Sequence, residues 1–177
     1  MEAERLVAVI RQALAQSRET PDIIAEAWQA QALAQAVGSR LAVSGPKGLR
    51  GEARALSEIG GRSSGALDHP AARAGIARAA RLSEVSDPRA ALTGLGALLG
   101  EVGIALVGVA CETDEQSLYW QCMEAIDAAD ESTDRVRGML RLLDERDREQ
   151  REDLERGRER DGPHGVLHGP GPVTGIQ

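Results

Sequence analysis

The sequence predicts an all-α protein, a helical bundle rich in Ala and Gly. Apolar residues recur at spacings of three and four through most of the chain, which is the period of one face of a helix. Proline follows a capping residue at several of the expected helix starts. Only 2% of the 177 residues are aromatic, so the core is expected to consist of Leu, Val, Ile and closely packed Ala.

The first two helices are predicted over residues 3–18 and 21–42. Leu6, Ile10 and Leu14 form one stripe of the first helix. Thr20 and Pro21 mark the start of the second as cap and first residue, and the stretch ending in Gly45-Pro46 stops it. The apolar seam of this second helix comprises Ile23, Ala27, Ala30, Ala34, Val37 and Leu41. Its alternating spacing is typical of close, coiled-coil-like packing.

Two shorter helices follow. One is expected from about residue 46 to 59, and the Gly- and Ser-rich residues 62–68 are predicted to form a loop. Pro70 begins the next short helix, with His69 as a local cap at its start.

Residues 88–111 are predicted to form the central buried helix. Asp87-Pro88 supplies another cap and first-turn proline. The apolar stripe comprises Leu92, Leu95, Leu99, Val102, Leu106 and Val109. The segment is long enough to span a bilayer, but Glu101 in mid-span, five glycines and the lack of a basic flank favour a soluble core helix. We therefore expect no membrane partner.

A last long helix is predicted over residues 114–150. Thr113 and Gln116 fit a capping box at its start. The inner seam is expected to comprise Tyr119, Cys122, Ile126, Ala129, Thr133, Val136, Leu140 and Leu143. A short break within residues 130–134 is an open alternative. Residues 1–145 are thus the predicted bundle domain, 146–160 a charged helical extension held by i,i+4 ion pairs, and 161–177 a disordered Gly/Pro tail.

Charge is unevenly distributed along the chain. The net charge is −7, which disfavours a protein whose whole surface grips nucleic acid. Residues 40–82 nevertheless carry a local charge of +5, and residues 83–132 carry −9. A small nucleic-acid-binding regulator that uses the basic 40–82 region, with two short helices as a helix-turn-helix, is one alternative function.

The acidic first residues do not resemble a signal peptide, so a cytoplasmic location is expected. Cys111 and Cys122 are then expected to be reduced and buried. We find no catalytic constellation, cofactor fingerprint or metal-ligand spacing in the sequence, and we expect neither cofactor nor metal. An enzyme is therefore not the favoured interpretation.

A few residues are candidates for binding. Glu101 is the one charge in an apolar stretch, where desolvation would raise its pKa unless an arginine meets it. A small-ligand binder or enzyme centred on Glu101 is a second alternative function. Trp28 and Trp120 lie off the predicted seams and are candidate partner contacts. Val136, Leu140 and Leu143 lie where the helix runs past the expected core, and they are the candidate contacts of a homodimer; the competing arrangement packs them on Leu6 and Ile10.

The segment AEAWQAQALAQAVGSRLAVSGP at residues 25–46 and the segment at residues 94–140 resemble a family of small, uncharacterised helical proteins of actinobacteria. The resemblance covers roughly residues 1–145 and implies a host but no activity or cofactor. A helical interaction or regulatory protein, whose first partner is another protein or a second copy, is the leading hypothesis.

Overall fold

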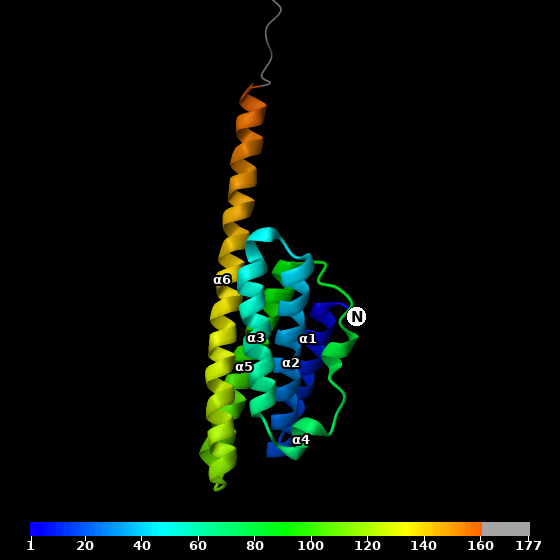
Figure 1. The fold of residues 1–177 in the computed structure, drawn as a ribbon, viewed down its shortest axis with the longest axis vertical. Coiled ribbons are helices and arrows are strands. Elements are labelled where there is room, and N and C mark those ends of the chain that lie inside the picture. The colour runs from blue at the N-terminus through cyan, green and yellow to red at the C-terminus, as the bar shows by residue number, and fades with distance from the viewer. Residues whose placement is uncertain (161–177) are drawn as a thin grey trace, which may run out of the picture. The chain divides into compact units, whose positions relative to one another are not determined.

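The computed structural model describes residues 1–160, and in this part of the chain every regular element is helical (Figure 1). The all-α prediction is confirmed, whereas the predicted disordered tail at 161–177 lies outside the described residues. The elements are α1 (Ala3–Gln16), α2 (Thr20–Ser44), the 3-10 turn η1 (Lys47–Leu49), α3 (Arg50–Ala66), α4 (Pro70–Arg73), the 3-10 turn η2 (Arg78–Arg81), α5 (Pro88–Glu112) and α6 (Gln116–Arg160). The chain divides into two units, Met1–Leu143 and the residues from Asp144 onward.

Helix starts follow the local signals closely. The Asp87 carboxylate accepts a hydrogen bond from the Ala90 backbone N–H at 3.0 Å, and Nδ1 of His69 accepts one from the Ala71 N–H at 3.1 Å. Both caps precede a first-turn proline, as predicted. The capping box at Thr113 differs, because its hydroxyl accepts from the Glu115 N–H rather than from Gln116.

Helix α2 forms the centre of the first unit, where it contacts α1, α3, α4, α5 and η2 (Figure 1). Its residues are therefore buried on several sides, including Ile24, Leu33 and Leu41. The predicted stripe of α5 from Leu92 to Val109 is buried against this centre, which confirms the prediction for the inner side of that helix.

Helices α2 and α3 approach each other through two glycines. A Cβ atom added to Gly38 would lie 2.6 Å from the Ser57 backbone nitrogen, and one added to Gly60 would lie 2.7 Å from the Gln35 nitrogen. The two backbones are thus in direct contact at both places. Beside the Gly38 contact, the Ser39 and Ser57 hydroxyls form a hydrogen bond of 2.7 Å.

This contact explains an incorrect prediction. Residues 62–68 were expected to form a loop, but α3 continues through them to Ala66. Ser63 is buried within α3, and Leu67, the residue that follows the helix, is also buried. Packing of the glycine-rich segment against α2 therefore outweighs its weak intrinsic tendency to form a helix.

The inner seam of α6 is also shifted from the prediction. Its buried residues are Leu118, Cys122, Ala125, Ala129, Ser132, Val136, Met139 and Leu143, while Tyr119 is exposed and Ile126, Thr133 and Leu140 are only partly buried. The helix continues through 130–134 without a break, and the Thr133 hydroxyl donates to the Ala129 carbonyl at 2.8 Å. The buried side of α6 therefore includes Leu118 in place of Tyr119.

In the second unit, residues 144–158 of α6 have exposed side chains. Arg156 lies 3.6 Å from a Glu152 oxygen and 3.2 Å from an Asp153 oxygen. These pairs, at spacings of four and three, are of the kind expected from the alternating charges.

Candidate interaction surface

The outward side of α5 is apolar although it faces solvent. Ile104 is 76% exposed and Val107 is 48% exposed. With their exposed neighbours at helical spacing they form a stripe that we call the α5 outer face, which comprises Ala97, Gly100, Ile104, Val107, Gly108 and Cys111. Since the opposite side of α5 lies in the core, this helix is apolar nearly all round but covered on only part of its surface. Contiguous exposed apolar surface of this kind is typical of an interaction site.

Within residues 1–160, α5 is also the one helix long and apolar enough to cross a membrane by length and composition. Core helices of soluble proteins have the same property, and the Leu92-to-Val109 stripe of α5 is part of the core cluster.

The glycines of α5 divide into two groups. A Cβ atom on Gly94 would lie 3.2 Å from Val7, and one on Gly96 would lie 3.2 Å from Val136, so these two allow α1 and α6 to pack closely. A Cβ atom on Gly100, Gly103 or Gly108 would meet nothing within 4 Å in the described chain. Each such glycine costs a helix about 1 kcal/mol relative to Ala. Packing among residues 1–160 gives no reason for these three glycines.

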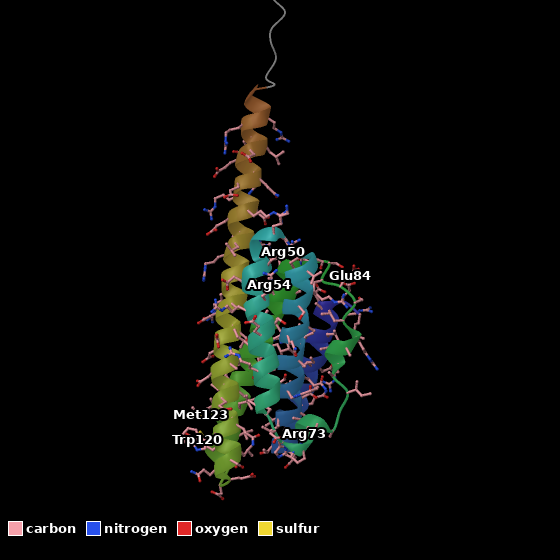
Figure 2. All side chains as sticks on the ribbon, viewed as in Figure 1. Arg50, Arg54, Arg73, Glu84, Trp120 and Met123 are labelled. Carbon is pink, nitrogen blue, oxygen red and sulfur yellow. The ribbon has the colours of Figure 1, made fainter. Side chains whose placement is uncertain are left out.

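Two aromatic side chains lie near the N-terminal end of α6. Tyr119 is 38% and Trp120 58% exposed, and their rings meet edge to face with centroids 5.3 Å apart and planes at 81°. Figure 2 shows Trp120 and Met123 on the first turns of α6, pointing away from the rest of the unit. The candidate contact Trp120 is therefore exposed, and large exposed aromatics of this type are frequent binding hot spots.

Glu101 is paired with Arg11 of α1. The Arg11 Nε donates to both carboxylate oxygens of Glu101, at 3.1 and 3.0 Å, and Nη2 donates to Oε1 as well. Hydrogen bonding to Glu101, and then its charge, raises the pKa of Arg11. Both side chains are partly exposed, so Glu101 is not the isolated carboxylate in an apolar setting that the sequence suggested. The pair lies on the side of α5 that faces α1, at the edge of the α5 outer face.

The other candidate residues are less accessible. Trp28 is partly buried and packs against the core. Val136 and Leu143 are buried in the core of their own chain, and Leu140 is partly buried against it. Two of the three residues suggested as dimer contacts are therefore not available as exposed surface.

The basic region does not form a helix-turn-helix. Its first helix, α3, has 17 residues, and α4 has four, which is too short for a recognition helix. Several of its arginines have partners within the chain: Arg62 pairs with Glu131, Arg73 with Asp68, and Arg78 with Glu26. Figure 2 shows Arg50 and Arg54 on one end of α3 and Arg73 near the opposite end of the unit, so the positive charges are dispersed.

A polar cluster that sequence reasoning missed fixes the segment around η2. The buried carboxylate of Glu26 accepts two hydrogen bonds from the Arg78 guanidinium, one of them 2.8 Å long. Gln29, also buried, donates to the Ile76 carbonyl at 3.2 Å and accepts from the Arg78 N–H at 2.8 Å. Hydrogen bonding to Glu26 raises the pKa of Arg78. In the sequence, this cluster was indicated by the polar residues Glu26 and Gln29 within the Ala-rich α2. That signal did not show which residues they contact.

The two cysteines differ in environment. Cys122 is buried, and desolvation raises the pKa of its thiol. Cys111 is exposed, which corrects the expectation that both are buried. Among residues 1–160 no group of three or more His, Cys, Asp or Glu side chains is arranged to hold a metal ion.

The chain belongs to the family of unknown function DUF6099, which matches residues 1–142. This range ends at the boundary of the first structural unit, so the family corresponds to the helical bundle. Comparison with curated proteins and with solved structures gives no match.

Proposed function

We propose that this chain is a helical protein-protein interaction protein and that its first partner is a second copy of itself. The observation that carries the proposal is the α5 outer face, an exposed apolar stripe on a helix whose other side is in the core. Tyr119 and Trp120 add a second exposed surface, of aromatic side chains, at the start of α6. Burial of such surface is the usual driving force for association.

Charge and backbone shape favour a second copy of the chain as the partner that covers the α5 outer face. Two chains of net charge −7 repel each other over most of their surfaces, so self-association is most favourable where the surface has no charge. The six residues of the α5 outer face are uncharged. Gly100 and Gly108 leave room for the backbone of another helix, as Gly38 and Gly60 do inside the chain. A symmetric pair in which α5 packs on its copy would use the same surface twice.

Sedimentation equilibrium over a range of micromolar loadings tests the proposal. The intact chain is expected to approach twice 18.8 kDa as concentration rises. Ile104→Asp is expected to keep the chain at the monomer mass, because a charge in the contact is desolvated without a partner. Ile76→Asp is the matched control, since Ile76 is 88% exposed and lies outside the α5 outer face.

A mass of 18.8 kDa at every loading would exclude the homodimer. Equal loss of association in both aspartate variants would place the contact elsewhere. Cys111 provides a second readout because it is exposed in the α5 outer face. Its rate of alkylation is expected to fall as the protein concentration rises, and to stay constant for Ile104→Asp.

The proposal includes a cytoplasmic location and an actinobacterial host. Two cysteines that form no disulfide support a reducing compartment. Lys47 is the single lysine among 21 basic residues, which supports a genome rich in G and C. The pairing of Glu101 with Arg11 gives the alternative of an enzyme centred on Glu101 no support.

A further inference from the structure

An open hollow of about 270 Å³ lies between α2 and α3, apart from the α5 outer face. Its lining residues are Ser39, Ala42 and Val43 from α2, and Arg54, Ser57 and Glu58 from α3. Val43 is 79% exposed, so the hollow has an apolar wall that faces solvent. The Ser39 and Ser57 hydroxyls form a hydrogen bond with each other. The charged groups that remain for a binding partner are therefore the Arg54 guanidinium and the Glu58 carboxylate.

The lining of this α2–α3 hollow matches the chemistry of an indole ring. Ala42 and Val43 offer apolar contact to the ring. A guanidinium is attracted to the face of an aromatic ring, most strongly to that of tryptophan. A carboxylate accepts hydrogen bonds, and the indole N–H is a donor that usually has a partner when it is buried. Arg54 and Glu58 are both exposed, and neither forms an ion pair within residues 1–160. The hollow is thus suited to a tryptophan side chain.

Trp120 is a tryptophan that its own chain leaves exposed. Its side chain is 58% exposed, whereas Trp28 is partly buried against the core. Figure 2 shows Trp120 near one end of the first unit and Arg54 nearer the other. Trp120 therefore does not reach the α2–α3 hollow of its own chain, and a contact between the two requires a second copy.

The local charges of the two surfaces are complementary. Residues 112–127, on either side of Trp120 in the sequence, carry five acidic side chains and no basic one. Residues 40–58, which include the hollow, carry four basic and two acidic side chains, a local charge of +2. Opposite charges of this kind attract two surfaces and orient them as they meet. Because one chain carries both halves of the contact, a second copy is favoured over an unrelated partner.

We propose that Trp120 of one chain binds in the α2–α3 hollow of a second copy, head to tail. The indole ring packs on Ala42 and Val43, the Arg54 guanidinium lies against its face, and its N–H donates to the Glu58 carboxylate. The contact joins two different surfaces, so each chain keeps one free Trp120 or one free hollow and further copies can add. A contact with one anchor residue is weak, with a Kd on the order of 0.1–1 mM. It therefore forms above the micromolar loadings that test the α5 homodimer.

Two variants that each lack one half of the contact test the proposal, both in the Ile104→Asp background that removes the α5 contact. The hollow variant carries Val43→Gln and Arg54→Glu, both at exposed positions, and keeps Trp120. The tryptophan variant carries Trp120→Ala and keeps the hollow. The ¹⁵N-labelled hollow variant is titrated with the unlabelled tryptophan variant to about 1 mM. The indole N–H resonance of Trp120 is expected to shift in a saturable manner, and that of Trp28 to stay in place.

The first control titrates the labelled hollow variant with the unlabelled hollow variant, and no shift of Trp120 is expected. The matched charge control compares two further changes in the tryptophan variant. Arg54→Glu is expected to weaken binding at least about fivefold. Arg146→Glu, which makes the same charge change at an exposed position outside the hollow, is expected to leave the affinity unchanged.

Three results would overturn the proposal. The Trp120 resonance could stay in place up to about 1 mM, it could shift equally in the titration without a hollow, or Arg54→Glu and Arg146→Glu could weaken binding equally. The last result would assign the association to non-specific charge attraction. Because Ile104→Asp is present throughout, the outcome is independent of the α5 homodimer, and failure of either contact leaves the test of the other unchanged.

Discussion

Replacement of Gly38 by Ala tests the closest helix contact in the protein. The added Cβ atom would lie 2.6 Å from the Ser57 nitrogen, 2.7 Å from the Ala53 carbonyl oxygen and 3.0 Å from the Ser57 Cα. All three are backbone atoms and cannot rotate away, so α2 and α3 have to separate by about 1 Å to restore ordinary contact distances. Overpacking of this kind costs about 1–3 kcal/mol, and rigid neighbours place Gly38→Ala near the upper end.

Alanine also favours a helix over glycine by about 1 kcal/mol. We therefore expect Gly38→Ala to lower the free energy of unfolding by about 2 kcal/mol, which corresponds to a fall in Tm of about 4–8 °C for a chain of this size. Gly103→Ala is the control, because its Cβ meets nothing within 4 Å. It is expected to raise stability by about 1 kcal/mol.

Urea and thermal unfolding followed by circular dichroism measure both variants. The two substitutions add the same methyl group to a helical glycine, so opposite signs isolate the effect of the α2–α3 contact. If Gly38→Ala were as stable as the intact chain while Gly103→Ala gained stability, the two backbones would not be in contact at Gly38, and the reasoning would be refuted.

Three further predictions concern Ser63, Cys122 and the basic region. Ser63→Ala removes a buried hydroxyl without a partner in the described chain and is expected to raise the free energy of unfolding by about 1 kcal/mol in urea titrations; a decrease would show that the hydroxyl is bonded. Because burial raises the pKa of Cys122, the unfolded state loses its proton first as pH rises. The contribution of this thiol to stability is thus fully present below the ordinary thiol pKa. It is lost as the pH rises through the higher pKa that the thiol has in the folded state. Stability is expected to fall between about pH 8 and 10, and Cys122→Ala should remove this part of the slope; an identical slope in the variant would assign it to other groups. In mobility-shift assays, nucleic acid is expected to associate weakly and with strong salt dependence, whereas nanomolar sequence-specific binding at physiological salt would contradict the dispersal of the arginines.

Local signals in the sequence were sufficient to predict most of the helices. The caps at His69 and Asp87 involve residues only two and three positions apart, so the sequence alone specifies both partners. The stripe from Leu92 to Val109 is long and regular, which left one choice of buried side. These features depend on neighbours along the chain and not on the arrangement of the bundle.

Features that depend on a distant partner could not be predicted. Residues 62–66 look like a loop until Gly60 is known to contact the α2 backbone. In α6 two registers share Cys122, Ala129, Val136 and Leu143. Only the position of the neighbouring helices decides that Leu118 is buried and Tyr119 exposed. Glu101 was recognised as unusual, but its partner Arg11 lies 90 positions away.

The comparison of α2 with α5 shows why an uncovered surface is the least predictable part of a site. Both helices have 25 residues and are apolar on several sides. Helix α2 is surrounded by α1, α3, α4, α5 and η2, and its Gly38 is in contact with α3. Helix α5 packs on α1, α2 and, through Gly96, on α6, and its Gly100 and Gly108 have no neighbour within residues 1–160. Composition specifies that a helix can be covered on all sides, but the number of neighbours is decided by the whole fold. Because α5 is suited to one more helix than its own chain supplies, a second copy of α5 is the neighbour that we propose.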